Sequence, residues 1–391
     1  MREVYVAGIG ITSFSRLEYP LAEIAAYPAM LALRDAGLKA VDQVYVANMG
    51  SARINNQTAL GSAVVDTLGL TPTGAERIEN GPASGASAVK QGFLGVAAGM
   101  YEAVLVTGCE RMREVNNLEA TDFVATMTHP LAEYIYGVTL PAHAAMFTRL
   151  YMERYGVTAR HLAMVAVKNH ANAMLNPFAH LHQPITVEGI LDSPEAFTNN
   201  PYVAEPLRFF DCCPVSDGGA AVILASREKM AELGKPLIRL AGIGQATDTL
   251  AVFERPDPTD LLAVRRSAAS AFAMAGLTPG DVHVAELHDA FTILEIVESE
   301  EAGFFPKGEG HLALEKGATA LGGPLPINPS GGLKGKGHPV GATGVGQVHE
   351  IVTQLRGDAG ERQVAGAKVG FTCNFGGFGN NVISMVFVRE E

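Results

Sequence analysis

The chain of 391 residues is 48% apolar and 18% charged, and its formal net charge is −12 at pH 7. That length exceeds one simple core, so we expect two domains or two similar halves. The acidic balance, without a basic cluster, argues against nucleic acid as a partner, and no apolar run is long enough to span a bilayer. The opening "MREVYVAGIG" predicts a first strand and lacks the features of a signal peptide, so we expect a soluble cytoplasmic protein.

The first predicted strand begins an internal repeat. "VYVAGIG" from Val4 resembles "IRLAGIG" from Ile238, and "ALRDAGLKAVDQVYVA" from Ala32 resembles "AFAMAGLTPGDVHVAE" from Ala271. Each copy predicts a strand, an amphipathic helix that ends at Ala-Gly-Leu, and a second strand. Two copies of one βα-rich unit therefore predict an α/β protein of two similar halves.

The stretch "IENGPASGASAVKQGFLGVAAGMYEAVLVTG" (78–108) predicts a turn, a small-residue helix and a buried strand. The start of such a helix suits a nucleophile, because the helix dipole and free N–H groups stabilise an anion there. The residue at this position is Pro82, which fits the first turn of a helix but carries no nucleophile. The neighbouring hydroxyl groups belong to Ser84 and Ser87.

Residues from about 112 to 210 interrupt the alternation of helices and strands. This segment contains two predicted helices, at 142–156 and 159–175, and a stretch rich in Pro and Asn. We expect it to be a lobe inserted into the first half, and such a lobe commonly shapes a binding cleft.

Further strands alternate with helices on either side of this lobe, which predicts layers in the order α/β/α. The predicted strands are 103–108, 219–226, 282–287, 368–373 and 381–388. The last two flank the glycine turn "NFGGFGN" and are expected to be antiparallel neighbours. The boundary between the halves is expected near 231–236, which gives the two units 1–233 and 234–391.

Three segments of the second half carry candidate chemistry. "NPSGGLKGKGHPVGATGVGQ" (328–347) holds His338 in a stiff glycine-framed loop before a helix, where an imidazole can act as a donor or proton shuttle. "FTCNFGGFGNN" ends a strand at Cys373 beside a glycine turn, whose N–H groups can form an oxyanion nest. "AELHDAFTILE" places His288 and Asp289 at a strand end, where α/β folds bind ligands. A structural loop histidine and an inert buried cysteine are the alternatives.

These segments, in this order, resemble the thiolase superfamily, and within it the sterol-carrier-type thiolases with their bacterial and archaeal relatives. "GHPVGATG" resembles the Gly-His-Pro motif, "HDAF" the Asn-Glu-Ala-Phe or His-Asp-Cys-Phe segment, and "CNFGGFG" the Cys-x-Gly-Gly-Gly-x-Gly segment. "DCCPVSDGGAAVIL" and "AVKNHANAMLNP" are also similar to family segments, so the resemblance covers nearly the whole chain. It implies the thiolase fold, with two similar βα halves in five layers, α/β/α/β/α, and an inserted lobe in the first half.

The resemblance also implies the chemistry. In the family, a cysteine at a central helix start attacks a 3-oxoacyl-CoA, releases a shortened acyl-CoA and passes its acyl group to free CoA. By this resemblance His338 activates the thiolate and donates to an oxyanion, Cys373 moves protons next to the thioester, and His288 holds an oxyanion water or contacts the substrate. CoA is a substrate, and neither a covalently bound cofactor nor a metal is expected. The residues expected to contact CoA are Ala290, Phe291, Ser330, Gly331 and Gly377.

The sequence departs from the family pattern at two positions. Pro82 stands where the nucleophilic cysteine belongs, in a segment that aligns without a gap. Phe375 stands where glycine is usual, and its side chain is positioned to narrow the pocket. The other cysteines, Cys109, Cys212 and Cys213, are expected to be packing residues. The fold is therefore expected without its nucleophile.

Three functions remain open. The first is a thiolase-type enzyme that cleaves or forms the C–C bond β to a CoA thioester. Such an enzyme is expected to work with a small zinc-ribbon/OB-fold partner subunit, on a bulky or aromatic substrate such as benzoylsuccinyl-CoA. The second is a retro-aldol lyase, which needs no acyl-enzyme; because the last tyrosine is Tyr202, the second half cannot supply a tyrosine acid. The third is a catalytically silent scaffold that binds acyl-CoA or a partner.

A silent scaffold does not need both His338 and Cys373 in glycine-framed settings. The sequence therefore favours C–C chemistry β to a thioester, with transfer to CoA ahead of aldol cleavage. The family resemblance also implies a homodimer that pairs through the central sheets.

Overall fold

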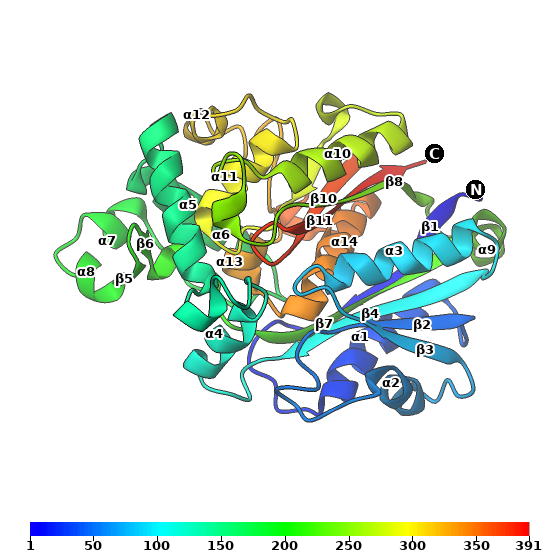
Figure 1. Ribbon diagram of the computed structural model, residues 1–391. Coiled ribbons are helices and arrows are strands. Elements are labelled where there is room, and N and C mark those ends of the chain that lie inside the picture. Colours follow the sequence, from blue (N-terminus) through cyan, green and yellow to red (C-terminus); the bar gives the residue numbers. More distant parts are fainter. Residues whose placement is uncertain (391) are drawn as a thin grey trace.

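The computed structural model describes residues 1–390, which form a nine-stranded mixed sheet in the order β3-β2-β4-β7-β1-β8-β11-β10-β9 (Figure 1). The strands are β1 (Val4–Ile11), β2 (Gln43–Ala47), β3 (Gly74–Ile78), β4 (Ala103–Arg111), β7 (Asp217–Ser226), β8 (Ile238–Thr247), β9 (Val284–Glu286), β10 (Val369–Gly376) and β11 (Asn381–Arg389). One antiparallel pairing, Tyr5 with Arg239, links β1 to β8. The strands of the two halves are therefore joined into one sheet by a short pairing between β1 and β8.

The two halves repeat one strand order, in agreement with the internal repeat in the sequence. β7, β4, β2 and β3 follow β1 outward, and β11, β10 and β9 follow β8. Ile327 forms a parallel bridge to β9 and occupies the place that β3 has beside β2. The repeated Ala-Gly-Leu sequences end α1 (Leu21–Ala36) and α10 (Leu262–Ala275), where Gly37 and Gly276 cap the helices with φ of 77° and 68°.

Helices cover both outer faces of the strands and also fill the space between the halves. The bounds are α2 (Leu60–Leu68), α3 (Ser84–Ala97), α11 (Thr292–Glu301) and α14 (Val340–Arg356). α1 and α2 lie on the outer face of the first half, α10 and α11 on that of the second, and α3 and α14 lie between them (Figure 1). A Cβ at Gly85 of α3 would lie 2.8 Å from the Gly344 nitrogen of α14, so these two helices touch. The five-layered thiolase fold is thereby confirmed.

The segment 112–210 forms a largely helical lobe, as predicted. It contains α4 (Asn117–Ala125), α5 (Leu140–Tyr155), α6 (Ala159–Met174), α7 (Val187–Leu191), α8 (Ala196–Asn199), β5 (Tyr202–Ala204) and β6 (Leu207–Arg208). Leu140 and Phe147 of α5 share one buried core with Leu287 and Phe291 of the second half. The lobe therefore packs against the second half, although the first half contains it in sequence.

The predicted strands and helices are all present, and β10 and β11 pair antiparallel as expected. The remaining helices are α9 (Arg227–Leu233), α12 (Gly310–Glu315) and α13 (Gly332–Lys336). The predicted boundary after residue 233 coincides with the end of α9, and the division into 1–233 and 234–391 stays a prediction. One local prediction is wrong: α3 begins at Ser84, so Pro82 lies in the turn before the helix instead of its first turn. No helix within residues 1–390 has the length and apolarity to cross a membrane.

Candidate functional site

The loop before α14 presents His338. Gly337 has a φ of 110°, and a Cβ there would come 2.7 Å from the Ser216 hydroxyl oxygen, so glycine is required. The same oxygen accepts the His338 backbone N–H at 3.3 Å. In the first turn of α14, the buried Glu110 carboxylate accepts the Gly341 N–H at 3.0 Å. These contacts fix the backbone on both sides of the imidazole.

The Thr343 hydroxyl orients the His338 ring. Its oxygen lies 2.7 Å from His338 Nδ1 and 2.9 Å from the Pro339 carbonyl oxygen. When the hydroxyl donates to the carbonyl, Nδ1 is the donor in the contact with Thr343. In that tautomer the neutral ring has its proton on Nδ1 and a lone pair on Nε2.

The contact with Asn374 indicates which ring nitrogen of His288 carries the proton. Asn374 Oδ1 accepts the Ala86 N–H at 3.4 Å, which orients the amide so that Nδ2 donates to His288 Nδ1 at 3.2 Å. The neutral His288 ring therefore carries its proton on Nε2. Glu298 accepts the His288 backbone N–H at 2.8 Å, and the Phe375 ring stacks on the imidazole with centroids 5.2 Å apart.

The two imidazoles stand edge to face, with ring centroids 5.0 Å apart. Burial lowers the pKa of His338 to about 3, and burial together with His338 lowers the pKa of His288 well below its usual value. Both rings are therefore neutral at pH 7. Within residues 1–390 neither Nε2 atom has a hydrogen-bond partner, and both rings line one cavity. The pair thus offers one base, His338, and one donor, His288.

The cavity has a volume of about 150 Å³ and lies where the two halves and the inserted lobe meet. It brings together six residues that the sequence analysis singled out as site residues or as the lost nucleophile position: His338, His288, Ala290, Phe291, Gly377 and Pro82. Phe375 also lines it, so its aromatic side chain forms part of the pocket wall, as the sequence analysis expects.

The turn before α3 supplies neither a nucleophile nor an N–H group at residue 82, because proline has neither. The Ser84 hydroxyl is fully buried, donates to the Gly81 carbonyl at 2.5 Å and accepts the Asn80 N–H at 2.8 Å. The Ser87 hydroxyl accepts from the Asn80 amide at 2.9 Å. Neither serine lines the cavity, so neither supplies a nucleophile to it.

The other thiols are held in their protonated form. Cys212 and Cys213 line the cavity, but burial raises the pKa of the Cys213 thiol to about 12 and raises that of Cys212 as well. The Cys212 sulfur donates to the Arg208 carbonyl at 3.7 Å. Cys109 is fully buried in β4, where burial raises its pKa well above the usual value. A thiol is a weak nucleophile compared with its thiolate, so these cysteines are poorly suited to attack.

Cys373, Ser330 and Gly331 do not line the cavity. Cys373 is fully buried in β10, where Ser384 donates to its sulfur at 3.9 Å, and burial and Glu298 raise the pKa of its thiol well above the usual value. Ser330 is fully buried and donates to Glu286 at 2.7 Å.

Gly331 packs against α6, since a Cβ there would lie 2.7 Å from that of Ala173. Asp289 also has a structural contact: its carboxylate accepts the backbone N–H groups of Leu333 and Lys334 at 2.6 and 3.3 Å. These contacts place the two residues in the framework behind the loop that carries His338.

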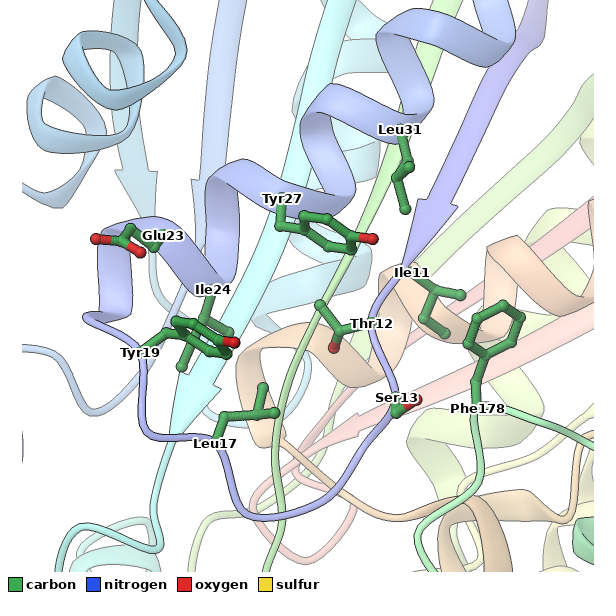
Figure 2. A pocket seen from close by; sticks show the side chains of 10 residues that line it. All are labelled: Ile11, Thr12, Ser13, Leu17, Tyr19, Glu23, Ile24, Tyr27, Leu31 and Phe178. Atoms are coloured by element: carbon green, nitrogen blue, oxygen red, sulfur yellow. The ribbon is translucent and has the colours of Figure 1, made fainter.

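A larger hollow, of about 540 Å³, lies between α1 and the loop that follows β1. Figure 2 shows the rings of Tyr19, Tyr27 and Phe178 along its wall. It contains neither imidazole of the pair and no residue that the sequence analysis assigned to the site. The smaller cavity is therefore the candidate active site.

Two α/β halves around a central helix pair, with two imidazoles at one cavity, define a thiolase-fold protein with an acid–base site. A family model described as "Thiolase, N-terminal domain" matches residues 9–228, and one described as "Thiolase C-terminal domain-like" matches 244–389. The chain belongs to the thiolase superfamily, in its sterol-carrier-type branch. CoA is a substrate in this family and not a resident cofactor.

Relatives named for different activities resemble the chain. It is 41% identical to an acetyl-CoA acetyltransferase of Methanothermobacter thermautotrophicus, over the full length of both proteins. It is 31% identical to human sterol carrier protein 2, over 98% of this chain and 72% of that protein. A solved structure described as "Ltp2-ChsH2(DUF35) aldolase" aligns with a TM-score of 0.84 and 27% identity, over 99% of this chain and 98% of that one. An acyltransferase and an aldolase are thus both similar to the chain. Similarity does not distinguish the two reactions, so the geometry of the site has to be considered.

Proposed function

We propose that this protein makes or breaks the C–C bond β to a CoA thioester, with His338 as base, His288 as oxyanion donor and no acyl-enzyme at residue 82. The observation that carries this proposal is the pair of buried imidazoles, 5.0 Å apart between ring centroids, that line one cavity. General acid–base catalysis needs a proton acceptor and a donor within reach of one substrate. The lining also includes Pro82, which leaves the covalent route of the family without its attacking atom.

Direct transfer to CoA is the first form of the reaction. His338 Nε2 takes the proton of the CoA thiol, and the sulfur attacks the 3-oxo carbon of a 3-oxoacyl-CoA. Collapse of the tetrahedral oxyanion breaks the C2–C3 bond and leaves the enolate of the second acyl-CoA, whose oxygen accepts from His288 Nε2. The protonated His338 then returns its proton to C2. The products are two acyl-CoAs, and no covalent enzyme intermediate forms.

Aldol cleavage is the second form, and the aldolase structure with a TM-score of 0.84 favours it. Here His338 Nε2 takes the proton of a 3-hydroxyl group, and the C2–C3 bond breaks to give a carbonyl compound and the same thioester enolate. His288 again holds the enolate oxygen, and His338 returns the proton to C2. The two forms use one imidazole pair and differ in whether free CoA is consumed.

Free CoA therefore distinguishes the two forms. We expect the purified protein to consume a 3-oxoacyl-CoA only when free CoA is present, with two acyl-CoAs formed in equal amounts by liquid chromatography and mass spectrometry. Release of a carbonyl compound from a 3-hydroxyacyl-CoA without free CoA would instead establish aldol cleavage. If acyl-CoAs bind but no C–C product forms in either assay, the protein is the silent scaffold and the proposal is wrong.

The roles of all the predicted site residues, His338 and His288 included, stay predictions. The proposal returns the proton to C2 through His338, because Cys373 lies outside the cavity lining. An acid–base role of Cys373 would require its thiol to reach the substrate. Ala290, Phe291 and Gly377 line the cavity and are proposed to contact the acyl-CoA, whereas Ser330 and Gly331 would have to act through the loop backbone.

Asn374 is a positioning residue in this proposal, and the sequence analysis did not identify it. Replacement of Asn374 by leucine removes the donor to His288 Nδ1, so the Nε2 proton is no longer assigned to that atom. We expect kcat to fall about tenfold, the value of one lost hydrogen bond, with KM within about twofold. Asn374→Asp tests the tautomer, since its carboxylate favours the proton on Nδ1 and should lower kcat at least as much. Equal kcat values for the unmodified protein, Asn374→Leu and Asn374→Asp would contradict the positioning role of Asn374.

The assembly and location of the protein are also proposed. The family resemblance supports a homodimer core and a small zinc-ribbon/OB-fold partner subunit, and the name of the similar Ltp2-ChsH2(DUF35) aldolase structure supports a complex with a second protein. The cytoplasmic location expected from the sequence stays a proposal.

A further inference from the structure

The wall of the active-site cavity carries no charge. Apart from the two imidazoles, its polar side chains are the Thr121 hydroxyl and the thiols of Cys212 and Cys213. The rest of the lining consists of proline, glycine, alanine, aliphatic, methionine and phenylalanine residues, with no Asp, Glu, Lys or Arg among the residues that the structure describes there. A group that enters this space must therefore be stable without a charged partner.

No cation belongs to the cavity wall. The Lys334 ammonium interacts electrostatically with the thiols of Cys213 and Cys212 but lies outside the lining, 5.5 Å from the centre of the Phe210 ring. Arg255 donates to the Phe378 carbonyl at 2.8 Å and pairs with Asp248 at 3.7 Å. His338 and His288 are neutral at pH 7 because burial lowers the pKa of both. A carboxylate on the acyl group would thus enter a wall that offers it no cation, which is costly.

Aromatic rings also limit the size of the cavity. Phe375 lies parallel to His288 within 8°, and Phe378 is fixed edge-on against Phe147 with ring centroids 5.5 Å apart. The remaining volume of about 150 Å³ equals that of engineered protein cavities that hold one benzene ring. The Phe375 ring is part of the cavity wall and takes up space there.

We infer that the acyl group accepted by this cavity is uncharged, apolar and no larger than about one six-membered ring, and that Phe375 sets this limit. The inference rests on the proposed function, which it deepens by naming the substrate class. It favours short-chain, branched or monocyclic acyl groups. An acyl group with a free carboxylate, such as benzoylsuccinyl, lies outside this class.

Binding of unreactive thioesters tests the inference separately from catalysis. Pentanoyl-CoA and glutaryl-CoA match in length and differ by a terminal carboxylate, and benzoyl-CoA and decanoyl-CoA differ in size. By titration calorimetry of the full chain, we expect glutaryl-CoA to bind about 100-fold more weakly than pentanoyl-CoA, and decanoyl-CoA at least about tenfold more weakly than benzoyl-CoA. The inference would be overturned if the Kd of glutaryl-CoA exceeded that of pentanoyl-CoA by less than tenfold, or if the Kd of decanoyl-CoA exceeded that of benzoyl-CoA by less than threefold. It would also be overturned if none of the four thioesters bound.

Phe375→Ala tests the size limit. Removal of the ring should strengthen decanoyl-CoA binding about tenfold, since two or more additional methylene groups become buried, and should leave the discrimination against glutaryl-CoA intact. Phe272→Ala, which removes a buried ring outside the cavity, is the matched control and should leave both ratios unchanged. Unchanged decanoyl-CoA binding in folded Phe375→Ala would overturn the role of Phe375. If the apolar preference holds but no C–C product forms, the proposed function fails and the inference stands.

Discussion

Replacement of His338 by alanine should lower kcat/KM at least about 100-fold, the loss expected for a missing acid–base or oxyanion group. The variant removes the one unpartnered lone pair of the imidazole pair, while the Ser216 contact to the backbone N–H and the Glu110 contact to α14 remain. We therefore expect the fold and acyl-CoA binding to persist. Initial rates, with a thermal melt and a binding titration on the same samples, measure the three effects.

The pH profile adds a second readout for His338. The base acts in its neutral form, which predominates above its pKa of about 3. The rate should therefore be insensitive to this group between about pH 5 and 8 and should fall only as the pH approaches 3. An acid limb near pH 6.5 would show that the imidazole titrates in its ordinary range and would contradict the buried neutral state.

Cys373→Ala is the matched comparison for this experiment. The thiol lies outside the cavity lining, so its removal should lower kcat/KM less than tenfold. A loss as large as that of His338→Ala would assign the acid–base role to Cys373 and would require the thiol to reach the substrate. Unchanged turnover in His338→Ala would remove His338 from the mechanism.

Local signals explain why much of the fold could be predicted. The two Ala-Gly-Leu sequences end helices at Gly37 and Gly276 because glycine readily adopts the left-handed cap. Buried strands such as β7 and β10 appear in the sequence as short apolar runs between turns. The packing of the inserted lobe against the second half could not be predicted, since it depends on contacts such as that of Phe147 with Phe378, which are distant in sequence.

In the candidate site, too, residues with local sequence signals could be predicted, whereas contacts between distant segments could not. His338 and His288 have local signals, a glycine-proline loop and a strand end. Cys373 and Phe375 lie on one face of β10, because strand residues alternate. The sequence does not reveal how far the cavity extends along that face, and it ends at Phe375. Asn374 lies between these two residues in the strand, and its partners His288 and Ala86 come from distant segments of the sequence.

Replacement of Pro82 by cysteine should place a nucleophile at the active-site cavity. Residue 82 lines the same cavity as His338 and precedes the N-terminus of α3, whose dipole stabilises a thiolate. We expect incubation with a 3-oxoacyl-CoA to give an acyl adduct on the variant, visible by intact mass, and iodoacetamide to label residue 82. The unmodified protein should give no such adduct.

Two control variants, Pro82→Ser and Pro82→Ala, distinguish the effect of the added thiol from the effect of removing the proline ring. Both remove the ring and add an N–H group at residue 82, but neither supplies a sulfur nucleophile, so neither should be labelled by iodoacetamide at this position. An acyl adduct on the unmodified protein would mean that another side chain attacks, and peptide mapping would identify it, with Cys213 of the cavity wall as the first residue to inspect. The central claim is that proton transfer between two neutral imidazoles replaces covalent catalysis here, and a native acyl-enzyme is the observation that would refute it.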